Sequence, residues 1–544
     1  GAYTAPDFGL TGATGEPSVA DVIDWVNGSD VLDDDNNPAT TQRNVMGDPL
    51  HAQPGIVAYG GTPGNEDIVV YTATNDGYLH AIDAATGAEL WSFIPGELLS
   101  RLGPLMINPD TSFKSYGIDG DVVPVFMDRD KNGIIDGDDF AYIVVGMRRG
   151  GSSYYALDVT DKNAPRLLWQ VSYAGMGQSW SRPVVTRVKV DDPGLNAEEA
   201  VVILGGGYDP VHDTATYPAA ADNAGAAAIM LDLESGAELW RAGRDAGADL
   251  VLSKMTRAIP SQIRVIDLNG DRFADRMYAA DVGGQLWRFD IFNGNTPANL
   301  VTGGVIAQIG AEGIAGPTAE DTRRVYNTPD VALIFDKNLN RRFISVNIGT
   351  GYRAHPLDTS AADALYSFRD PGVFSRLSQL DYDTYDVATS AEFVEVAGST
   401  QAVVTDNDRG WKFTLPANQM VLTNSAVFND ELFFVAFAPD TVAASECTVR
   451  VGRNFLYRVS ILNGDPIVNN IDALADADAD PARVEELAQG GIAPSPRVLF
   501  PSPEPDCTGD ECKPPPIFCV GVECSDPGFA NNPVRTLWTQ DGIE

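Results

Sequence analysis

The sequence has 544 residues, of which 76 are acidic and 37 are basic, giving a formal net charge of −39. This charge repels phosphate backbones and anionic lipid head groups, so we expect no nucleic-acid partner, and no apolar run of about 18 residues predicts a membrane-spanning helix. The 53 glycines and 35 prolines favour many turns and short strands over long helices.

The N-terminus lacks the features of a targeting segment. Residues 1–11 have neither the charged start nor the apolar middle of a signal peptide. The sequence opens with the composition of a loop, so we expect a processed or excised fragment whose targeting signal preceded it. The length allows either several average domains or one large repeat architecture.

The first clear element is a hairpin that occurs twice. Asp83-Ala-Ala-Thr-Gly-Ala-Glu-Leu-Trp91 is nearly repeated as Asp232-Leu-Glu-Ser-Gly-Ala-Glu-Leu-Trp240. Each copy follows an apolar run, which predicts a strand, a tight turn from Asp to Gly, and a second strand ending at Trp. The glycine supplies the positive φ that the turn needs, and the Trp offers a large surface for packing between neighbouring sheets.

Between these two copies, residues 128–139 form an acidic loop. Its oxygen donors fall at positions 1, 3, 5, 9 and 12, with a backbone carbonyl at 7 and glycine at 6, which is the calcium-loop pattern. Asp occupies the last position, where Glu is usual, and its shorter side chain predicts weaker bidentate binding of calcium. An exposed acidic turn is the alternative, but carboxylates this close repel one another without a cation. The predicted Ca²⁺ ligands are Asp128, Asp130, Asn132, Ile134 (carbonyl), Asp136 and Asp139.

Weaker copies of the hairpin follow at irregular spacing. Sheets of about four strands cannot bury both faces alone, and radial stacking covers the faces and protects the edges. We therefore predict an all-β fold, a β-propeller of about seven irregular blades, with a chain of separate sandwiches as the alternative. The weaker copies are residues 154–158 with Trp169, 284–290, 364–368 and 454–457, and β-branched runs between them include 68–71, 142–145, 201–204 and 343–348.

A second acidic loop spans residues 267–275. Side-chain oxygens fall at positions 1, 3, 5 and 9, with a carbonyl at position 7. Arg272 occupies the glycine position and Tyr278 the closing-acid position, although Gly270 provides some backbone freedom. The motif alone leaves calcium binding open here. The predicted ligands are Asp267, Asn269, Asp271, Phe273 (carbonyl) and Asp275.

The C-terminal part differs in composition. We predict the propeller, with an N-terminal lead-in segment, over residues 1–480 and a Pro- and Cys-rich tail over residues 481–544. Cys507 and Cys512, then Cys519 and Cys524, form two closely spaced pairs that favour local disulfides over a zinc site, and Cys447 is left either as a buried thiol or as an alternative partner. The strand expected at 534–538 would close the propeller.

The sequence contains no recognisable catalytic site. The four histidines, His51, His80, His212 and His355, are scattered, and none has metal-ligand spacing to another. We find no nucleophile elbow and no phosphate-binding loop. His80, which lies within an apolar strand, is expected to be a buried histidine with a hydrogen-bond partner rather than a base. We therefore predict a binding or assembly module and not an enzyme.

Several segments carry a family resemblance. The hairpin unit resembles the repeat of quinoprotein propellers, which include dehydrogenases and noncatalytic assembly scaffolds. More specifically, segments in order along nearly the whole chain resemble the propeller domain of the PilY and PilC family of type IV pilus biogenesis factors and adhesins. These segments are residues 47–54, 75–83 with 93–95, 155–160, 206–209, 280–290 and 349–352.

The resemblance implies a function and a location. In that family an acidic loop precedes the segment that matches residues 280–290, which implies calcium ligation by the second acidic loop, whereas the loop at 128–139 looks like an addition. The resemblance further implies a secreted protein at the pilus tip or outer membrane, exported through the periplasm and not inserted in the membrane. Expected partners are type IV pilus subunits, the minor pilins, and host or abiotic surfaces.

Two functions follow as hypotheses. In the first, a calcium-loaded propeller primes the pilus, tunes its extension against retraction, and attaches to surfaces. In the second, calcium holds pyrroloquinoline quinone in a dehydrogenase, with a noncatalytic outer-membrane scaffold as a further variant. Adjacent cysteines, which many such dehydrogenases place against the cofactor, are absent from the sequence. This absence favours the pilus hypothesis.

Overall fold

The computed structural model describes residues 3–33, 36–43, 45–109, 114–191, 199–214, 220–312, 314–396, 403–440, 451–467, 483–501 and 514–525. Strands dominate this part of the chain, and its helices are all short. None of the described helices is long and apolar enough to span a membrane. The chain divides into a first unit, residues 1–185 with 232–237 and 541–544, and a second unit, residues 186–231 with 238–540.

Short helices form a small lead-in cluster in the first unit. The helix α1 (Val19–Val26) begins at Ser18, whose side chain accepts a hydrogen bond from the Asp21 backbone N–H while Asp21 caps the Ser18 N–H in return. Its buried residues Val22 and Trp25 pack with Phe8 and Leu102. The other helices of the cluster are η1 (Ala5–Phe8), η2 (Gly96–Arg101) and α2 (Leu102–Ile107).

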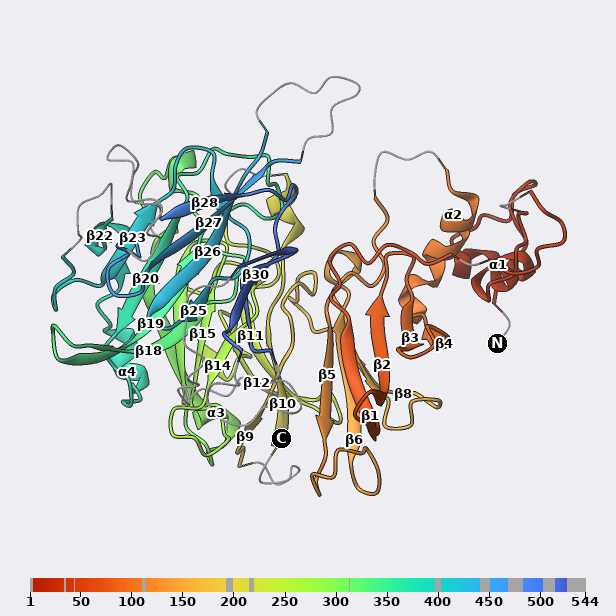
Figure 1. The fold of residues 1–544 in the computed structure, drawn as a ribbon, viewed down its shortest axis with the longest axis horizontal. Coiled ribbons are helices and arrows are strands. Elements are labelled where there is room, and N and C mark those ends of the chain that lie inside the picture. Colours follow the sequence, from red (N-terminus) through yellow and green to blue (C-terminus); the bar gives the residue numbers. More distant parts are fainter. Residues whose placement is uncertain are drawn as a thin grey trace. The chain divides into compact units, whose positions relative to one another are not determined.

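Two four-stranded antiparallel sheets make up most of the first unit, and their strands follow one another in chain order (Figure 1). Alternate side chains of these strands form one apolar core that includes Val57, Val69, Ile143 and Leu157. The strands are β1 (Gly55–Thr62), β2 (Asn65–Ala73), β3 (Leu79–Asp83) and β4 (Glu89–Phe93), then β5 (Val122–Met127), β6 (Phe140–Gly146), β7 (Tyr154–Asp158) and β8 (Arg166–Val171), with η3 (Arg148–Gly150) between β6 and β7.

The second unit contains five further sheets. Three of them gain an outer strand in parallel orientation, β13 beside β12, β21 beside β17, and β22 beside β23. The strands are β9 (Val184–Val188), β10 (Glu199–Gly205), β11 (Ala227–Asp232), β12 (Glu238–Gly243) and β13 (Leu250–Val251); β14 (Arg264–Ile266), β15 (Arg276–Ala280), β16 (Gln285–Ile291), β17 (Val301–Gln308) and β21 (Ala388–Thr389); β18 (Asp330–Asp336), β19 (Arg341–Gly349), β20 (Ala364–Asp370), β22 (Val394–Glu395) and β23 (Gly410–Thr414); β24 (Met420–Val421), β25 (Ala426–Phe428), β26 (Glu431–Ala438), β27 (Arg453–Ser460) and β28 (Val484–Leu487); β29 (Arg497–Leu499), β30 (Ile517–Val520) and β31 (Glu523–Ser525).

Short helical turns connect some of these strands. They are η4 (Pro210–Asp213), α3 (Pro297–Leu300), η5 (Ala319–Asp321), α4 (Gln379–Asp383) and η6 (Ser390–Glu392). The described residues therefore contain seven sheets, which agrees with the predicted number of blades.

The repeated hairpin predicted from the sequence is confirmed in detail. In one copy the Gly87 N–H donates to the Asp83 carbonyl over 2.8 Å, and Gly87 has a φ of 72°. In the other copy the Gly236 N–H donates to the Asp232 carbonyl over 2.9 Å, with a φ of 70°. Both hairpins also shift register just before the Trp, so the same bulge recurs.

At the end of the first hairpin copy and on β23, a Trp side chain binds the turn of another sheet, whereas the indole N–H of Trp240 in the second copy has no hydrogen-bond partner among the described residues. The Trp91 indole N–H donates to the Lys162 carbonyl over 2.8 Å, and the Trp411 indole N–H donates to the Ile461 carbonyl over 3.0 Å. Trp411 is fully buried and lies against Gly464, where any side chain would collide with its ring. Trp91 and Trp411 thus join sheets, as predicted for the Trp of the repeat.

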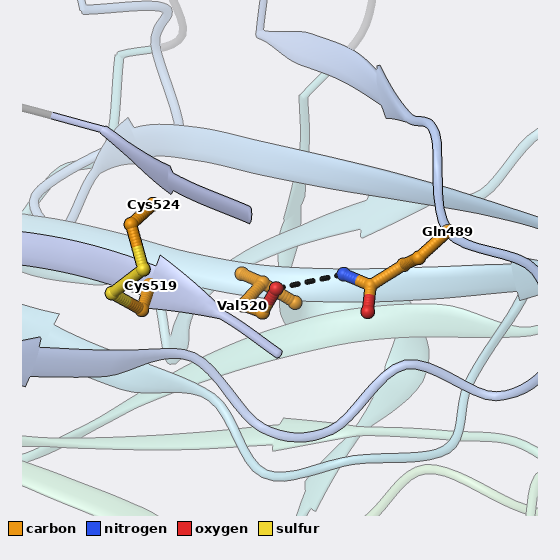
Figure 2. Close-up of a disulfide and its surroundings, with 4 residues drawn as sticks. All are labelled: Gln489, Cys519, Val520 and Cys524. Atoms are coloured by element: carbon orange, nitrogen blue, oxygen red, sulfur yellow. Dashed lines mark hydrogen bonds between the residues drawn. A yellow bond between two sulfur atoms is a disulfide. The ribbon is translucent and has the colours of Figure 1, made fainter. Parts of the chain in front are cut away.

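The C-terminal segment carries a disulfide. Cys519 and Cys524 lie opposite each other on β30 and β31 and are bonded, as Figure 2 shows. Beside them the Gln489 side-chain amide donates to the Val520 carbonyl over 2.7 Å (Figure 2). The predicted local disulfide is confirmed for this pair. Cys507, Cys512, Cys447 and the strand predicted at 534–538 lie outside the described residues.

Candidate metal-binding loops

The two acidic loops occupy equivalent places in their sheets. Residues 128–139 connect β5 to β6, and residues 267–275 connect β14 to β15. Each loop therefore joins an antiparallel pair, the first and second strands of its sheet, although the two sheets belong to different units.

Three carboxylates of the first acidic loop (residues 128–139) converge. One oxygen each of Asp128, Asp130 and Asp139 lies within 4.8 Å of the other two, and no other three His, Cys, Asp or Glu residues in the described segments come together in this way. No described basic side chain forms an ion pair with these three carboxylates. Their mutual repulsion is therefore left to solvent or to a bound cation.

Backbone N–H groups orient the first of these carboxylates. The Gly133 N–H donates to Asp128 Oδ2 over 2.7 Å, and this hydrogen bond is the main cause that lowers the pKa of Asp128. Gly133 has a φ of 79° and Lys131 a φ of 60°, so the chain turns tightly at both positions. The loop keeps Asp128 ionised and aimed inward.

For the remaining predicted ligands of the first loop, the structure shows hydrogen bonds within the loop. The Asn132 side-chain oxygen accepts a hydrogen bond of 2.7 Å from the Ile134 N–H. The Asp136 N–H donates to Asp139 Oδ2 over 3.2 Å, while the Asp136 carboxylate is not part of the converging group. Asp136, Asn132 and the Ile134 carbonyl therefore stay as predictions.

The second acidic loop (residues 267–275) has the same backbone architecture. Its first aspartate, Asp267, accepts a 2.7 Å hydrogen bond from the N–H of the sixth residue, Arg272, just as Asp128 does from Gly133. The fifth N–H donates to the third side chain and the seventh N–H to the fifth in both loops. Left-handed φ values again occur at positions 4 and 6, at Gly270 (77°) and Arg272 (72°). The departure from glycine at position 6 thus leaves the loop conformation unchanged.

The guanidinium group of Arg376 binds one carboxylate of the second loop. Asp275 Oδ1 lies 2.5 Å from Arg376 Nη2, and Asp275 Oδ2 accepts from the Leu268 N–H over 2.9 Å. The buried Phe273 ring lies 4.2 Å from Lys189 Nζ and 4.7 Å from the Arg187 guanidinium carbon. The carboxylates of Asp267, Asp271 and Asp275 do not form a converging group in this arrangement. The two loops therefore share a backbone conformation but differ in the charged groups around their carboxylates.

No sequence signal indicated Arg376. It lies about one hundred residues beyond the loop, on the connection between β20 and α4, and reaches Asp275 only through the tertiary fold. The left-handed φ of Arg272 was also not predictable from the sequence, because non-glycine residues rarely adopt this conformation.

The strain at Arg272 leads to a stability prediction. We expect Arg272→Gly to unfold at a higher urea concentration than Arg272→Ala, with a difference of about 1 kcal/mol, because only glycine adopts this φ without steric cost. Both variants remove the same exposed charge, so the comparison isolates the backbone. Equal stabilities of the two variants in urea unfolding would contradict the assignment of strain.

The histidines pair with carboxylates at separate places. His51 Nδ1 lies 2.8 Å from Asp119, and His212 Nε2 lies 2.9 Å from Asp222. His80 is buried, and its Nδ1 lies 3.1 Å from Glu89 Oε2, so its predicted character as a partnered histidine is confirmed.

The sheets of antiparallel strands, the Trp contacts and the acidic loops define a class, a β-propeller that carries calcium-loop motifs between its first and second strands. Residues 46–305 match the family model of the PilY1 beta-propeller domain. This match covers 260 of the 544 residues, and it confirms the family resemblance of the sequence for this part of the chain.

Individual relatives agree with this assignment. The type IV pilus biogenesis factor PilY1 of Pseudomonas aeruginosa is 31% identical over 229 residues, covering 41% of this chain and 17% of the relative. A PilY1 homolog of Xylella fastidiosa is 27% identical over 355 residues, covering 63% of this chain and 24% of the relative. The chain thus spans less than a quarter of these proteins.

A solved structure supports the fold. The crystal structure of the Pseudomonas aeruginosa PilY1 C-terminal domain superposes with a TM-score of 0.55 at 18% identity, covering 84% of this chain and 92% of that domain. At this identity the likeness establishes the fold, and the predicted all-β propeller with about seven blades is confirmed.

Proposed function

We propose that this chain is the calcium-binding propeller of a type IV pilus biogenesis factor that works at the cell surface. The observation that carries the proposal is the pair of acidic loops with one hydrogen-bond pattern at equivalent places in a PilY1-type propeller. The donors are all hard oxygens, the ligands that Ca²⁺ prefers. In the first loop the three converging carboxylates fit a cation directly.

The relatives support the proposed biological role. Proteins named type IV pilus biogenesis factors share this propeller region, which supports a role in pilus assembly for the protein containing this chain. We propose that calcium occupancy of the second loop tunes pilus extension against retraction, and that the propeller contacts minor pilins and attaches to host or abiotic surfaces. A location at the pilus tip or outer membrane, after export through the periplasm, belongs to the same proposal.

The dehydrogenase hypothesis receives less support. The curated relatives are named biogenesis factors, and none of those names refers to an enzyme. Retention of stoichiometric pyrroloquinoline quinone by the purified protein, seen by its absorbance, would revive that hypothesis.

Calorimetric titration with CaCl₂ tests the calcium proposal. We expect the wild-type protein to bind two Ca²⁺ ions, and we expect Asp128→Ala and Asp271→Ala each to lose one, because each removes a carboxylate from a different loop. Asp83→Ala is the matched control, since Asp83 also accepts backbone hydrogen bonds in a turn but belongs to neither loop. An unchanged calcium count in both loop variants would reject the proposal.

A cellular experiment tests the pilus role. In the organism that encodes this chain, we expect deletion of the gene to reduce surface pili, and we expect chromosomal Asp271→Ala to alter pilus number without changing the amount of the protein. Normal piliation in the deletion strain would contradict this role.

A further inference from the structure

Arg376 binds the last predicted ligand of the second acidic loop. Its Nη2 lies 2.5 Å from Asp275 Oδ1, and its guanidinium also lies 5.5 Å from the Phe292 ring. The other Asp275 oxygen accepts from the Leu268 N–H. Both oxygens of this carboxylate are therefore engaged, one of them by a positive charge that is not part of the loop.

The two side chains of this ion pair differ in solvent exposure. The Asp275 side chain is 3% exposed, whereas the Arg376 side chain is 36% exposed. The Asp275 backbone is fixed by hydrogen bonds to Ile266 and Ile291. The arginine can therefore turn into solvent, but the aspartate is held in place.

The chain around Arg376 is anchored independently of the ion pair. The Ser375 carbonyl accepts hydrogen bonds from the buried Arg276 and Arg288 at 2.8 and 2.6 Å, and the Leu377 N–H donates to Asp290 Oδ2 over 2.9 Å. Displacement of the Arg376 side chain therefore leaves its backbone where it is. The guanidinium is a partly exposed charge on a backbone held by hydrogen bonds.

We propose that Arg376 is an internal competitor of calcium, whose guanidinium neutralises Asp275 when the second acidic loop is empty and is displaced when Ca²⁺ binds there. This inference rests on the proposed calcium binding by that loop. A divalent cation beside Asp275 repels a guanidinium in contact with the same carboxylate. Because Asp275 is nearly inaccessible and Arg376 is not, the arginine is the group that moves.

The first acidic loop provides the internal contrast. No described basic side chain forms an ion pair with Asp128, Asp130 or Asp139. Calcium entering the first loop thus displaces no cation, whereas calcium entering the second must displace Arg376. Arg376 accordingly sets the calcium concentration at which the second loop fills.

Calorimetry in an Asp128→Ala background measures the second loop alone. We expect Arg376→Gln to lower its calcium Kd about tenfold, since a partly exposed charge-assisted hydrogen bond no longer competes. We expect Arg376→Lys, which retains the charge, to stay within about threefold of the parent. The matched control is Lys189→Gln, which removes a nearby charge that touches the Phe273 ring but no ligand carboxylate.

Thermal unfolding provides a second readout. We expect Arg376→Gln to lower the Tm of the second unit by about 1–2 °C in EDTA, and to have no effect in saturating calcium, because Arg376 contributes to stability only while it binds Asp275. Equal affinity gains in Arg376→Gln and Lys189→Gln, or equal Tm losses with and without calcium, would overturn the competition.

The two proposals fail in different ways. If calcium does not bind the second loop, Asp271→Ala leaves the calcium count unchanged, and the proposed calcium binding by that loop is rejected. If Asp271→Ala removes one ion but Arg376→Gln leaves the affinity unchanged, calcium binding stands and only the competition is wrong.

Discussion

Chelation of calcium is expected to lower the free energy of unfolding by about 2.7 kcal/mol for each loop previously held at one hundred times its Kd. The physical reason is that Ca²⁺ binds the folded loops, whereas the unfolded chain disperses their carboxylates. This corresponds to a fall in Tm of about 5–10 °C for the first unit, and of about 4 °C for the larger second unit. Differential scanning calorimetry in EDTA and in CaCl₂ measures it.

Loop variants assign this effect to each unit. Asp128→Ala should abolish the calcium-dependent shift of the first unit, and Asp271→Ala that of the second, because each loop belongs to one unit. Asp83→Ala should retain both shifts. Identical Tm values in EDTA and in CaCl₂ for the wild-type protein would show that neither loop binds calcium tightly.

Replacement of Arg288 by Ala is expected to destabilise the second unit by about 3–5 kcal/mol, because it removes the closer cation of the buried Asp370 and one of the two cations of the buried Asp290. Arg288 donates to Asp370 at 2.9 and 3.0 Å and to Asp290 at 2.9 and 3.1 Å, and all three side chains are buried. Arg276 remains 2.7 Å from Asp290 and 3.8 Å from Asp370, so each carboxylate keeps one cation, at a longer distance for Asp370. Urea unfolding in saturating calcium measures the loss.

A surface pair supplies the comparison. Arg453 and Glu486 are both more than half exposed and 3.8 Å apart, so Arg453→Ala should cost at most about 1 kcal/mol. A loss below that value for Arg288→Ala would mean that the buried cluster does not stabilise the second unit. Arg288→Lys, which lacks the planar fork, is expected to fall between the two variants.

The sheets were accessible from the sequence because each hairpin carries its own local signals. The Asp-to-Gly turn and the closing Trp specify the conformation within nine residues, at both 83–91 and 232–240. By contrast, the short parallel strands β13, β21 and β22 have two residues each and no alternation, so they gave no signal. Their existence depends on the sheets beside which they lie.

In the acidic loops, too, the sequence predicted the local features but not the long-range contacts. Their donor spacing and the turn at Gly133 were local, and both were found. The motif ranked the second loop lower because of Arg272, but the fold imposes a left-handed φ there, and the hydrogen bonds of the first loop recur. Which carboxylates converge was not predictable, since it depends on side-chain partners outside the loops.

The sequence by itself determined the strands, the turns and the two sets of oxygen donors, because each rests on residues only a few positions apart. Only the tertiary structure decided that Arg376 faces Asp275 and that Arg276 and Arg288 share the carboxylates of Asp290 and Asp370. Such pairs join residues up to about one hundred positions apart, and burial strengthens them by excluding water. No local sequence pattern indicates that these residues lie close together. The contact of Arg376 with Asp275 nevertheless makes the charge around the second loop different from that around the first.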